Sequence, residues 1–322
     1  MIISLVGATA SGKTETSLWL AQLLGGAEKV EIISADAMQL YRGMDIGTAK
    51  LPPEERQGIV HHQIDVLDIS QEASVAAYQR QTRQTIENIW ERGKTPLIVG
   101  GSGLYMSAVL DELDFPGTDP ALREELNRQA ETDKGSLLEE LRDKDPEAYR
   151  VIHPNNMRRI IRALEVIRLT GKPFTPRFPR HTSHYPFTIA LGIKREPENL
   201  QELIVQRAQH MMDSGLLDET RALIERGLRT APTASTATGY AQAISVIDGE
   251  MTEQEAVQSI ALATTQLAKK QKTWFKADPR ITWFDATHEP LEHIATNMYS
   301  HIRERMHTMD KTERMHTINR TE

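Results

Sequence analysis

The amino-acid sequence predicts an α/β protein in which a parallel sheet is interrupted by a helical insertion. Short apolar runs alternate with helical patterns over residues 1–113 and again over 186–300, which is typical of a parallel sheet covered by helices. Between these segments the alternation stops, and residues 114–185 contain Asp-Pro pairs of the kind that begin helices. The third observation is a glycine-rich segment directly after the first apolar run. We therefore expect a sheet-based core and a separate helical insertion.

Composition narrows the class of protein. Hydrophobic residues make up 39% of the 322 positions and charged residues 26%, as in ordinary globular proteins. The formal net charge is −7, so a nucleic-acid partner would need a local basic surface. The absence of cysteine excludes disulfides, cysteine-containing zinc sites and a thiol nucleophile. We recognise no secretion signal and no membrane-spanning stretch, and we expect a soluble cytoplasmic protein.

The segment GATASGKT at 7–14 has the spacing of a phosphate-binding loop. Its two outer glycines let the backbone curl so that successive N–H groups point at phosphate oxygens. Lys13 adds a positive charge, Thr14 offers a hydroxyl to Mg²⁺, and the following helix directs its positive end at the same anion. The predicted phosphate contacts are Gly7, Ala8, Thr9, Ala10, Ser11, Gly12, Lys13 and Thr14. The core is thus predicted to be a P-loop NTPase-like sheet, and a diphosphate ester fits such a loop as well as ATP does.

A second polar position follows the buried-type strand VEIIS at 30–34. Ligands of open α/β sheets lie beyond the carboxyl ends of the strands, so Asp36 is predicted to enter the same crevice as the phosphate loop. A turn or cap role is the alternative for this aspartate. Residues 37–50 form an unusually long connection, which favours a binding loop over a mobile surface loop. The glycine-rich turn at 100–103 is predicted to lie at the same carboxyl edge of the sheet, and by itself such a turn indicates tight packing.

Two basic segments are candidates for a nucleic-acid surface. The predicted helix at 157–169 has four arginines along the flanks of an apolar stripe, which suits either a solvated face or a phosphodiester backbone. These are Arg158, Arg159, Arg162 and Arg168. The predicted helix at 253–276 ends in lysines beside two aromatic residues, which either complement the helix dipole or form a surface on which bases stack. Residues 301–322 are predicted to form a flexible tail.

Taken in order, these motifs resemble those of the bacterial tRNA dimethylallyltransferases, also called tRNA isopentenyl transferases. The similarity extends over about residues 3–285. Its most specific segments are GATASGKT at 7–14, SADAMQLYRGMDIGTAK at 34–50, GGSGLY at 100–105, HPNNMRRIIRALEV at 153–166 and QLAKKQKTWF at 266–275. Agreement of several motifs in the same order makes the resemblance specific.

The resemblance implies transfer of a dimethylallyl group from dimethylallyl diphosphate to the exocyclic N6 amine of the adenosine 3′ of the anticodon, position 37 of tRNA, with Mg²⁺ as the cofactor. In an enzyme of this family, the phosphate loop holds the diphosphate, Lys13 neutralises it and Thr14 holds the metal ion. Asp36 orients the amine and accepts its proton, as a general base does. Arg207 matches the family's diphosphate-binding arginine.

The resemblance also implies contacts with a tRNA whose target adenine is flipped out of the anticodon loop. The matching positions are Asp36, Ala37, Met38, Gln39, Ser102, Arg123, Arg158, Arg159 and Arg162. Two positions depart from the family pattern, because Thr236 and Thr265 stand where relatives have arginine. The expected partners are the anticodon stem-loop and dimethylallyl diphosphate, with no membrane, and the expected state is a monomer.

Three alternatives follow from the residues themselves. A kinase or ATPase is the default function of a phosphate-binding loop. The strand at 97–99 ends in Gly-Gly where a second Mg²⁺-binding carboxylate is usual, but the strand that leads to Asp36 could supply it, so the sequence does not exclude this class. A prenyltransferase of free adenine nucleotides would use the same chemistry, but it would not need an arginine-rich insertion. An RNA-binding module with a vestigial nucleotide site is disfavoured, because the phosphate-loop motif is complete through Lys13 and Thr14 and because Asp36 is also present.

Overall fold

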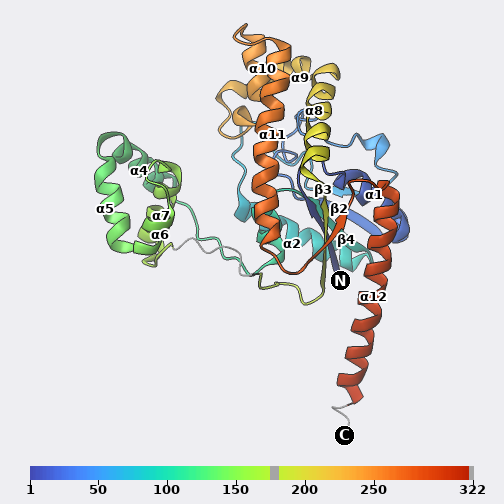
Figure 1. Ribbon diagram of the computed structural model, residues 1–322. Helices are drawn as coiled ribbons and strands as arrows, with labels where there is room; N and C mark the ends of the chain where they lie inside the picture. The colour runs from blue at the N-terminus through green and yellow to red at the C-terminus, as the bar shows by residue number, and fades with distance from the viewer. Residues whose placement is uncertain (175–180, 319–322) are drawn as a thin grey trace. The chain divides into compact units, whose positions relative to one another are not determined.

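The computed structural model describes residues 1–174 and 181–318, with backbone only for 309–318. The chain divides into two compact units (Figure 1). Unit 1 comprises Met1–Asp111 and Ser183–Glu322, and unit 2 comprises Glu112–Thr182. The sequence placed these two boundaries at 113/114 and 185/186. Residues 175–180, which belong to the predicted insertion 114–185, lie outside the described residues.

Unit 1 contains the predicted parallel sheet, here of six strands in the order β3-β2-β4-β1-β5-β6. The strands are β1 (Ile2–Gly7), β2 (Val30–Ser34), β3 (His61–His62), β4 (Thr95–Gly100), β5 (Thr188–Lys194) and β6 (Ile281–Asp285). Every strand pair is parallel. Strands β2, β3 and β4 lie on one side of β1, and β5 and β6 lie on the other. The connections therefore diverge at the carboxyl end of β1, where a crevice is expected.

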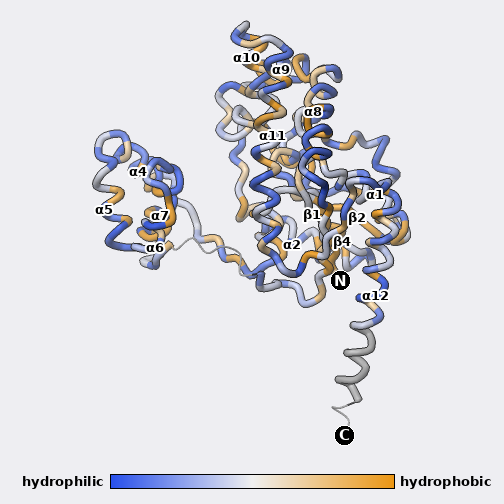
Figure 2. Tube along the Cα trace, viewed as in Figure 1, coloured by the Kyte–Doolittle hydropathy of each residue, from blue (hydrophilic) through white to orange (hydrophobic). Residues whose placement is uncertain are grey.

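Helices cover both faces of this sheet because alternate residues of each strand point to opposite sides. Ile3 and Leu5 of β1 pack in one apolar cluster, and Ile2 and Val6 pack in the other. Figure 2 shows hydrophobic residues along these central strands. The helices of this unit are α1 (Lys13–Leu23), α2 (Val75–Glu91), α3 (Gly103–Leu110), α8 (Pro197–Asp213), α9 (Leu216–Glu225), α10 (Tyr240–Ile247), α11 (Glu253–Lys276) and α12 (Leu291–Ile318).

The last four helices before β6 build a further apolar core. Residues of α8, α9, α10 and α11 pack together there, and they enclose Tyr41 and Met44 of the long connection 37–50. Both of these side chains are completely buried. The connection is therefore fixed against helices that begin only at residue 197 of the chain.

Unit 2 is helical, as the Asp-Pro pairs and the apolar stripe of the arginine-rich segment predicted. Its helices are α4 (Pro120–Thr132), α5 (Lys134–Lys144), α6 (Pro146–Val151) and α7 (Met157–Thr170). The side chains of Asp119, Asp145 and Asn156 accept hydrogen bonds from backbone N–H groups in the first turns of the helices that they precede. The apolar stripe of α7 is buried in the unit's own core. This stripe consists of Ile160, Ile161, Leu164 and Ile167.

The prediction of a flexible tail from residue 301 is wrong at its start. Helix α12 continues through this position to Ile318 and packs against α1. Ile302 is completely buried in the same cluster as Ile294 and Met298. Ile294, Met298 and Ile302 follow one another at intervals of four residues, so the apolar face of this helix extends past residue 300. No helix within the described ranges 1–174 and 181–318 is long and apolar enough to cross a membrane.

Strand β2, which leads to Asp36, contains a buried carboxylate. Glu31 is 3% exposed, and its carboxylate lies 2.7 Å from His62 Nε2, 2.6 Å from Arg92 Nη2 and 3.2 Å from Lys94 Nζ. Burial raises the pKa of Glu31, but hydrogen bonds from Arg92, His62 and Lys94 outweigh it and lower the pKa to about 2. The ionised form of Glu31 therefore stabilises the folded state.

We predict that this carboxylate makes stability pH-dependent. The pKa is lower in the folded than in the unfolded chain, so the stabilisation is complete above about pH 4.5 and is lost as the pH falls toward 2. Glu31→Gln should lower the free energy of unfolding by about 3 kcal/mol at pH 7 and less at pH 3. Urea denaturation at both pH values measures this, with exposed Glu225→Gln as the control. An equal loss at both pH values would contradict it.

Candidate active site

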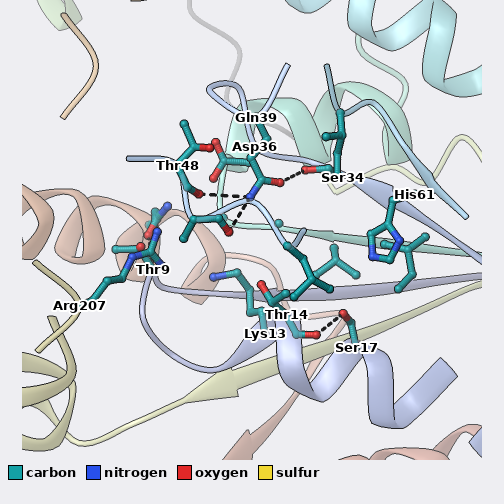
Figure 3. A pocket seen from close by; sticks show the side chains of 18 residues that line it. Thr9, Lys13, Thr14, Ser17, Ser34, Asp36, Gln39, Thr48, His61 and Arg207 are labelled. Atoms are coloured by element: carbon teal, nitrogen blue, oxygen red, sulfur yellow. Dashed lines mark hydrogen bonds between the residues drawn. The ribbon is translucent and has the colours of Figure 1, made fainter. Parts of the chain in front are cut away.

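A pocket lies where β1, β2 and β4 end. The phosphate loop contributes Thr9, Lys13 and Thr14 to its lining, and Asp36 and Gln39 enter from the segment after β2. The second glycine-rich turn, α8 and α11 supply Gly100, Gly101, Arg207 and Gln271. Figure 3 shows Lys13 at the start of α1, with Asp36 and Gln39 across the pocket and Arg207 to one side. The structure thus brings the predicted base and the predicted phosphate-binding cations into one site.

The phosphate loop requires its glycines for two different reasons. Gly12 has a φ of 99°, and it precedes α1, which begins at Lys13. A Cβ at Gly7 would lie 2.7 Å from the carbonyl oxygen of Ile193 on the neighbouring strand β5. The loop is therefore turned at its last glycine and packed closely against the sheet at its first, and its residues Thr9, Lys13 and Thr14 line the pocket.

Lys13 and Arg207, the two cations of this pocket, are both partly buried. Burial, and then repulsion by Arg207, lower the pKa of Lys13 to about 7, while Asp36 opposes the shift. Burial also lowers the pKa of Arg207, again opposed by Asp36. The Lys13 ammonium donates a hydrogen bond of 2.6 Å to the carbonyl oxygen of Ala8 within its own loop. A bound diphosphate would raise the pKa of Lys13 and relieve the repulsion between the two cations.

Asp36 is held at the pocket by backbone contacts between β2 and β4. A Cβ at Gly100 would lie 2.2 Å from the carbonyl oxygen of Ala35, so only glycine allows the two segments to approach this closely. Ser102 N–H donates to the same carbonyl at 3.2 Å, and Ser102 Oγ accepts from Ala37 N–H at 3.3 Å. Asp36 Oδ1 accepts from Met38 N–H at 3.0 Å. The glycine-rich turn therefore acts through tight packing, as the sequence indicated.

Gln39 is the fixed polar neighbour of Asp36 in the pocket. Its Oε1 accepts a hydrogen bond of 2.7 Å from Ser34 Oγ. Its Nε2 donates to the carbonyl oxygens of Thr48 and Ala49 at 3.3 and 3.5 Å. The lining of this pocket does not include Ala37, Met38 or Ser102, which shape the segment around Asp36 instead.

Two anchors of the phosphate loop were not predicted. Gln271 Oε1, on α11, accepts a hydrogen bond of 2.7 Å from Thr9 N–H. Arg195, just after β5, donates to the carbonyl oxygen of Ser11 at 3.0 Å. Gln271 stands within the lysine-rich end of the predicted late helix, but a contact between residues 262 positions apart has no local sequence signal. His61, at the end of the pocket beyond Thr14 in Figure 3, was also not selected from the sequence.

The arginines predicted to contact tRNA separate into two groups within unit 2. Arg123 and Arg162 donate to the completely buried carboxylate of Glu165 at 2.9 and 2.7 Å. These two side chains therefore hold α4 and α7 together. Arg158 and Arg159, at the start of α7, are exposed. The helix thus combines a structural ion-pair cluster with an exposed basic end.

The two departures from the family pattern also have defined surroundings. Thr236 is exposed, and its hydroxyl donates to the carbonyl oxygen of Thr233 at 3.0 Å. The hydroxyl of Thr265, on α11, lies 2.8 Å from Gln201 Oε1 on α8 and 2.8 Å from the carbonyl oxygen of Ala261. Neither residue lines the pocket.

We predict that Gln271 contributes to anion binding by holding the phosphate loop in shape. Gln271→Ala should weaken binding of magnesium pyrophosphate about three- to tenfold, the amount expected for one lost hydrogen bond. Isothermal titration measures this, and Gln266→Ala, an exposed glutamine of the same helix, is the control. Tighter binding by the Gln271 variant would show instead that its side chain competes with the anion for Thr9 N–H.

The site and the fold define the class of this protein. A phosphate loop follows a central strand of a parallel sheet, and two cations and a carboxylate share its pocket. This is a P-loop protein with a candidate general base beside its phosphate loop. The family model for IPP transferases matches residues 39–278. The chain belongs to the IPP transferase family.

Individual relatives agree over most of the chain. The tRNA dimethylallyltransferase of Thermobifida fusca is 50% identical over 284 residues, 88% of this chain and 89% of that protein. The tRNA dimethylallyltransferase of Streptomyces coelicolor is 48% identical, with 88% and 89% coverage. A tRNA isopentenylpyrophosphate transferase of Bacillus halodurans has a similar structure, with a TM-score of 0.70, 38% identity and coverage of 97% and 98%. A eukaryotic dimethylallyltransferase acting on tRNA gives a TM-score of 0.74 at 27% identity, with 89% of this chain and 74% of that chain covered.

Proposed function

We propose that this protein transfers a dimethylallyl group from dimethylallyl diphosphate to the N6 amine of adenosine 37 in tRNA and releases diphosphate. The observation that carries the proposal is that Asp36 enters the same pocket as the phosphate loop, with Lys13 and Arg207. Relatives about half identical over 88% of the chain are named tRNA dimethylallyltransferases. An anion site beside a carboxylate suits a reaction that releases diphosphate from one substrate and takes a proton from the other.

The reaction divides the work between the two sides of the pocket. On one side, the N–H groups of the phosphate loop, Lys13 and Arg207 bind the diphosphate and stabilise the charge that develops as the allylic C–O bond breaks. On the other side, the adenine N6 forms the new bond to C1 of the allyl group, and Asp36 accepts the proton that the amine loses. The electron pair of the broken bond leaves with the diphosphate.

The residues present also fit a Mg²⁺ ion. Thr14 lines the pocket at the position from which a phosphate loop offers its hydroxyl to the metal. Among the side chains that the structure describes, those of residues 1–174 and 181–308, no three carboxylates or histidines form a metal-binding cluster. Mg²⁺ commonly takes few protein ligands and completes its shell with water and substrate phosphates. Bound there, the ion would supply further positive charge to the diphosphate.

Action on tRNA requires that the target adenine is flipped out and that the protein offers a basic surface to the tRNA backbone. The pocket lies at the carboxyl end of the sheet and is lined by loops, so an adenine stacked in the anticodon loop would have to leave the stack to reach Asp36. Exposed Arg158 and Arg159 are suited to the phosphate backbone of the anticodon stem-loop. We propose that the protein acts as a monomer in the cytoplasm, where tRNA is modified.

The alternative functions account for fewer of these features. A kinase or ATPase would use a carboxylate after the strand next to β1, but this strand, β4, ends in Gly100, followed by Gly101. A transferase of free adenine nucleotides would leave the exposed arginines of unit 2 without a purpose. An RNA-binding module would not need two cations and a carboxylate in one pocket.

The deciding experiment is transfer of radiolabelled dimethylallyl from its diphosphate to unmodified tRNA with adenosine at position 37. Asp36→Asn should lower the rate constant of transfer about 10²- to 10⁴-fold, because the amide cannot accept the proton. Magnesium pyrophosphate should bind this variant at least as tightly as it binds the wild type, because the substitution removes a negative charge that faces Lys13 and Arg207. Undiminished transfer would remove Asp36 as the base. No transfer by the wild type, together with ATP hydrolysis, would favour the ATPase.

A second prediction separates the two groups of arginines. Substitution of both Arg158 and Arg159 by alanine should weaken tRNA binding about tenfold near 0.1 M salt and reduce its salt dependence, with unchanged stability. Arg123→Ala should instead lower the free energy of unfolding by about 1–3 kcal/mol, because the buried Glu165 carboxylate loses a partner. Filter binding over a range of salt concentrations and urea denaturation measure the two effects. Equal tRNA affinities of wild type and double variant would exclude the exposed arginines as contacts.

A further inference from the structure

A carboxylate outside the pocket holds the connection 37–50. Glu219, on α9, accepts hydrogen bonds from three successive backbone N–H groups of this connection. Its Oε2 lies 3.1 Å from Asp45 N and 2.8 Å from Ile46 N, and its Oε1 lies 3.4 Å from Gly47 N. The residues joined are more than 170 positions apart in the sequence. Three amide dipoles directed at one carboxylate form a strong, orientation-specific contact.

Tyr240 holds this carboxylate from the other side. Its hydroxyl donates to Glu219 Oε1 at 2.6 Å, and its side chain is completely buried. Burial and then the charge of Glu219 raise the pKa of Tyr240, so the phenol remains a donor. A Cβ at Gly47 would lie 2.4 Å from the Tyr240 ring, so the backbone of the connection rests directly on this ring. Glu219 and Tyr240 therefore fix the position of residues 45–47 together.

The fixed segment continues directly into the pocket. Thr48 and Ala49 follow it, line the pocket and accept hydrogen bonds from Gln39 Nε2. The amide group of Gln39 is oriented from both ends, by Ser34 Oγ at its Oε1 and by the carbonyl oxygens of Thr48 and Ala49 at its Nε2. Gln39 lies beside Asp36 in the pocket (Figure 3). A continuous series of contacts thus leads from Glu219 to the neighbour of the proposed base.

We propose that Glu219, oriented by Tyr240, is a positioning residue for prenyl transfer. It acts through residues 45–49 on Gln39, which faces the incoming adenosine, and not on the diphosphate. The proposal rests on the proposed function for the identity of this substrate. Lys50 secures the same connection independently, because its ammonium contacts Asp45, Asp65 and the carbonyl oxygen of Tyr41. A variant of Glu219 should therefore fold, with the loss confined to residues 45–49.

The first measurement needs no substrate. Glu219→Gln keeps the shape of the side chain but replaces one acceptor oxygen by a donor, so at least one N–H group of residues 45–47 loses its acceptor. Hydrogen exchange of a peptide that covers 42–50 should become about tenfold faster. Tyr240→Phe should change it in the same direction and less. Asp218→Asn is the matched control, because Asp218 is the neighbouring acid of α9 and pairs with Arg221 at the surface. Unchanged exchange at 42–50, or faster exchange throughout the protein, would overturn the proposal.

The second measurement separates the substrates. Glu219→Gln should lower kcat/KM for tRNA about 10- to 100-fold, as expected for a small displacement in the site, and leave KM for dimethylallyl diphosphate within about twofold. In a Gln39→Ala background the same substitution should have little additional effect, because the two residues act in series. Full additivity of the two substitutions, or a loss confined to the diphosphate KM, would overturn the proposal. Absence of transfer by the wild-type protein would instead overturn the proposed function, and the exchange result would still report whether Glu219 holds residues 45–49.

Discussion

The parallel pairing of β1, β2 and β4 is the constraint on which the rest of the site depends. In this pairing Val99 lies opposite both Leu5 and Ser34, so three strands end at one level. The phosphate loop, Asp36 and the second glycine-rich turn therefore emerge at the same edge of the sheet. Glycine at position 100 allows the last two of these segments to touch through their backbones. Charge and carboxylate are brought together by strand register rather than by any local motif.

The pocket is prepared for an anion before one binds. Lys13 and Arg207 are partly buried in the pocket, where burial lowers the pKa of both cations and Asp36 opposes the shift. Gln271 and Arg195 hold the phosphate loop that carries Lys13 in place. An anionic substrate gains the attraction without a cost of ordering the loop, which is how preorganised electrostatic sites stabilise developing charge.

Helices α8–α11 contribute residues to the pocket and hold the segments around it. They supply Arg207 and Gln271 to the pocket, and through Glu219 and Tyr240 they hold the connection that leads to Gln39. In unit 2, Arg123 of α4 and Arg162 of α7 neutralise buried Glu165, whereas Arg158 and Arg159 of α7 are exposed. A charged residue that matches a functional motif can therefore have a structural role, and a residue outside every motif can shape the site.

The sequence by itself determined the sheet, the phosphate loop, the position of Asp36 at the same edge of the sheet, and the helical insertion. Strand and helix periods and the loop spacing are local properties of the chain. The sequence did not reveal the anchors Gln271 and Glu219, nor the continuation of α12 beyond residue 300. The contacts of Thr9 with Gln271, and of the amides at 45–47 with Glu219, join residues more than 170 positions apart. Such partners are chosen by packing of whole helices against the sheet, and only the tertiary structure decides which donor meets which acceptor.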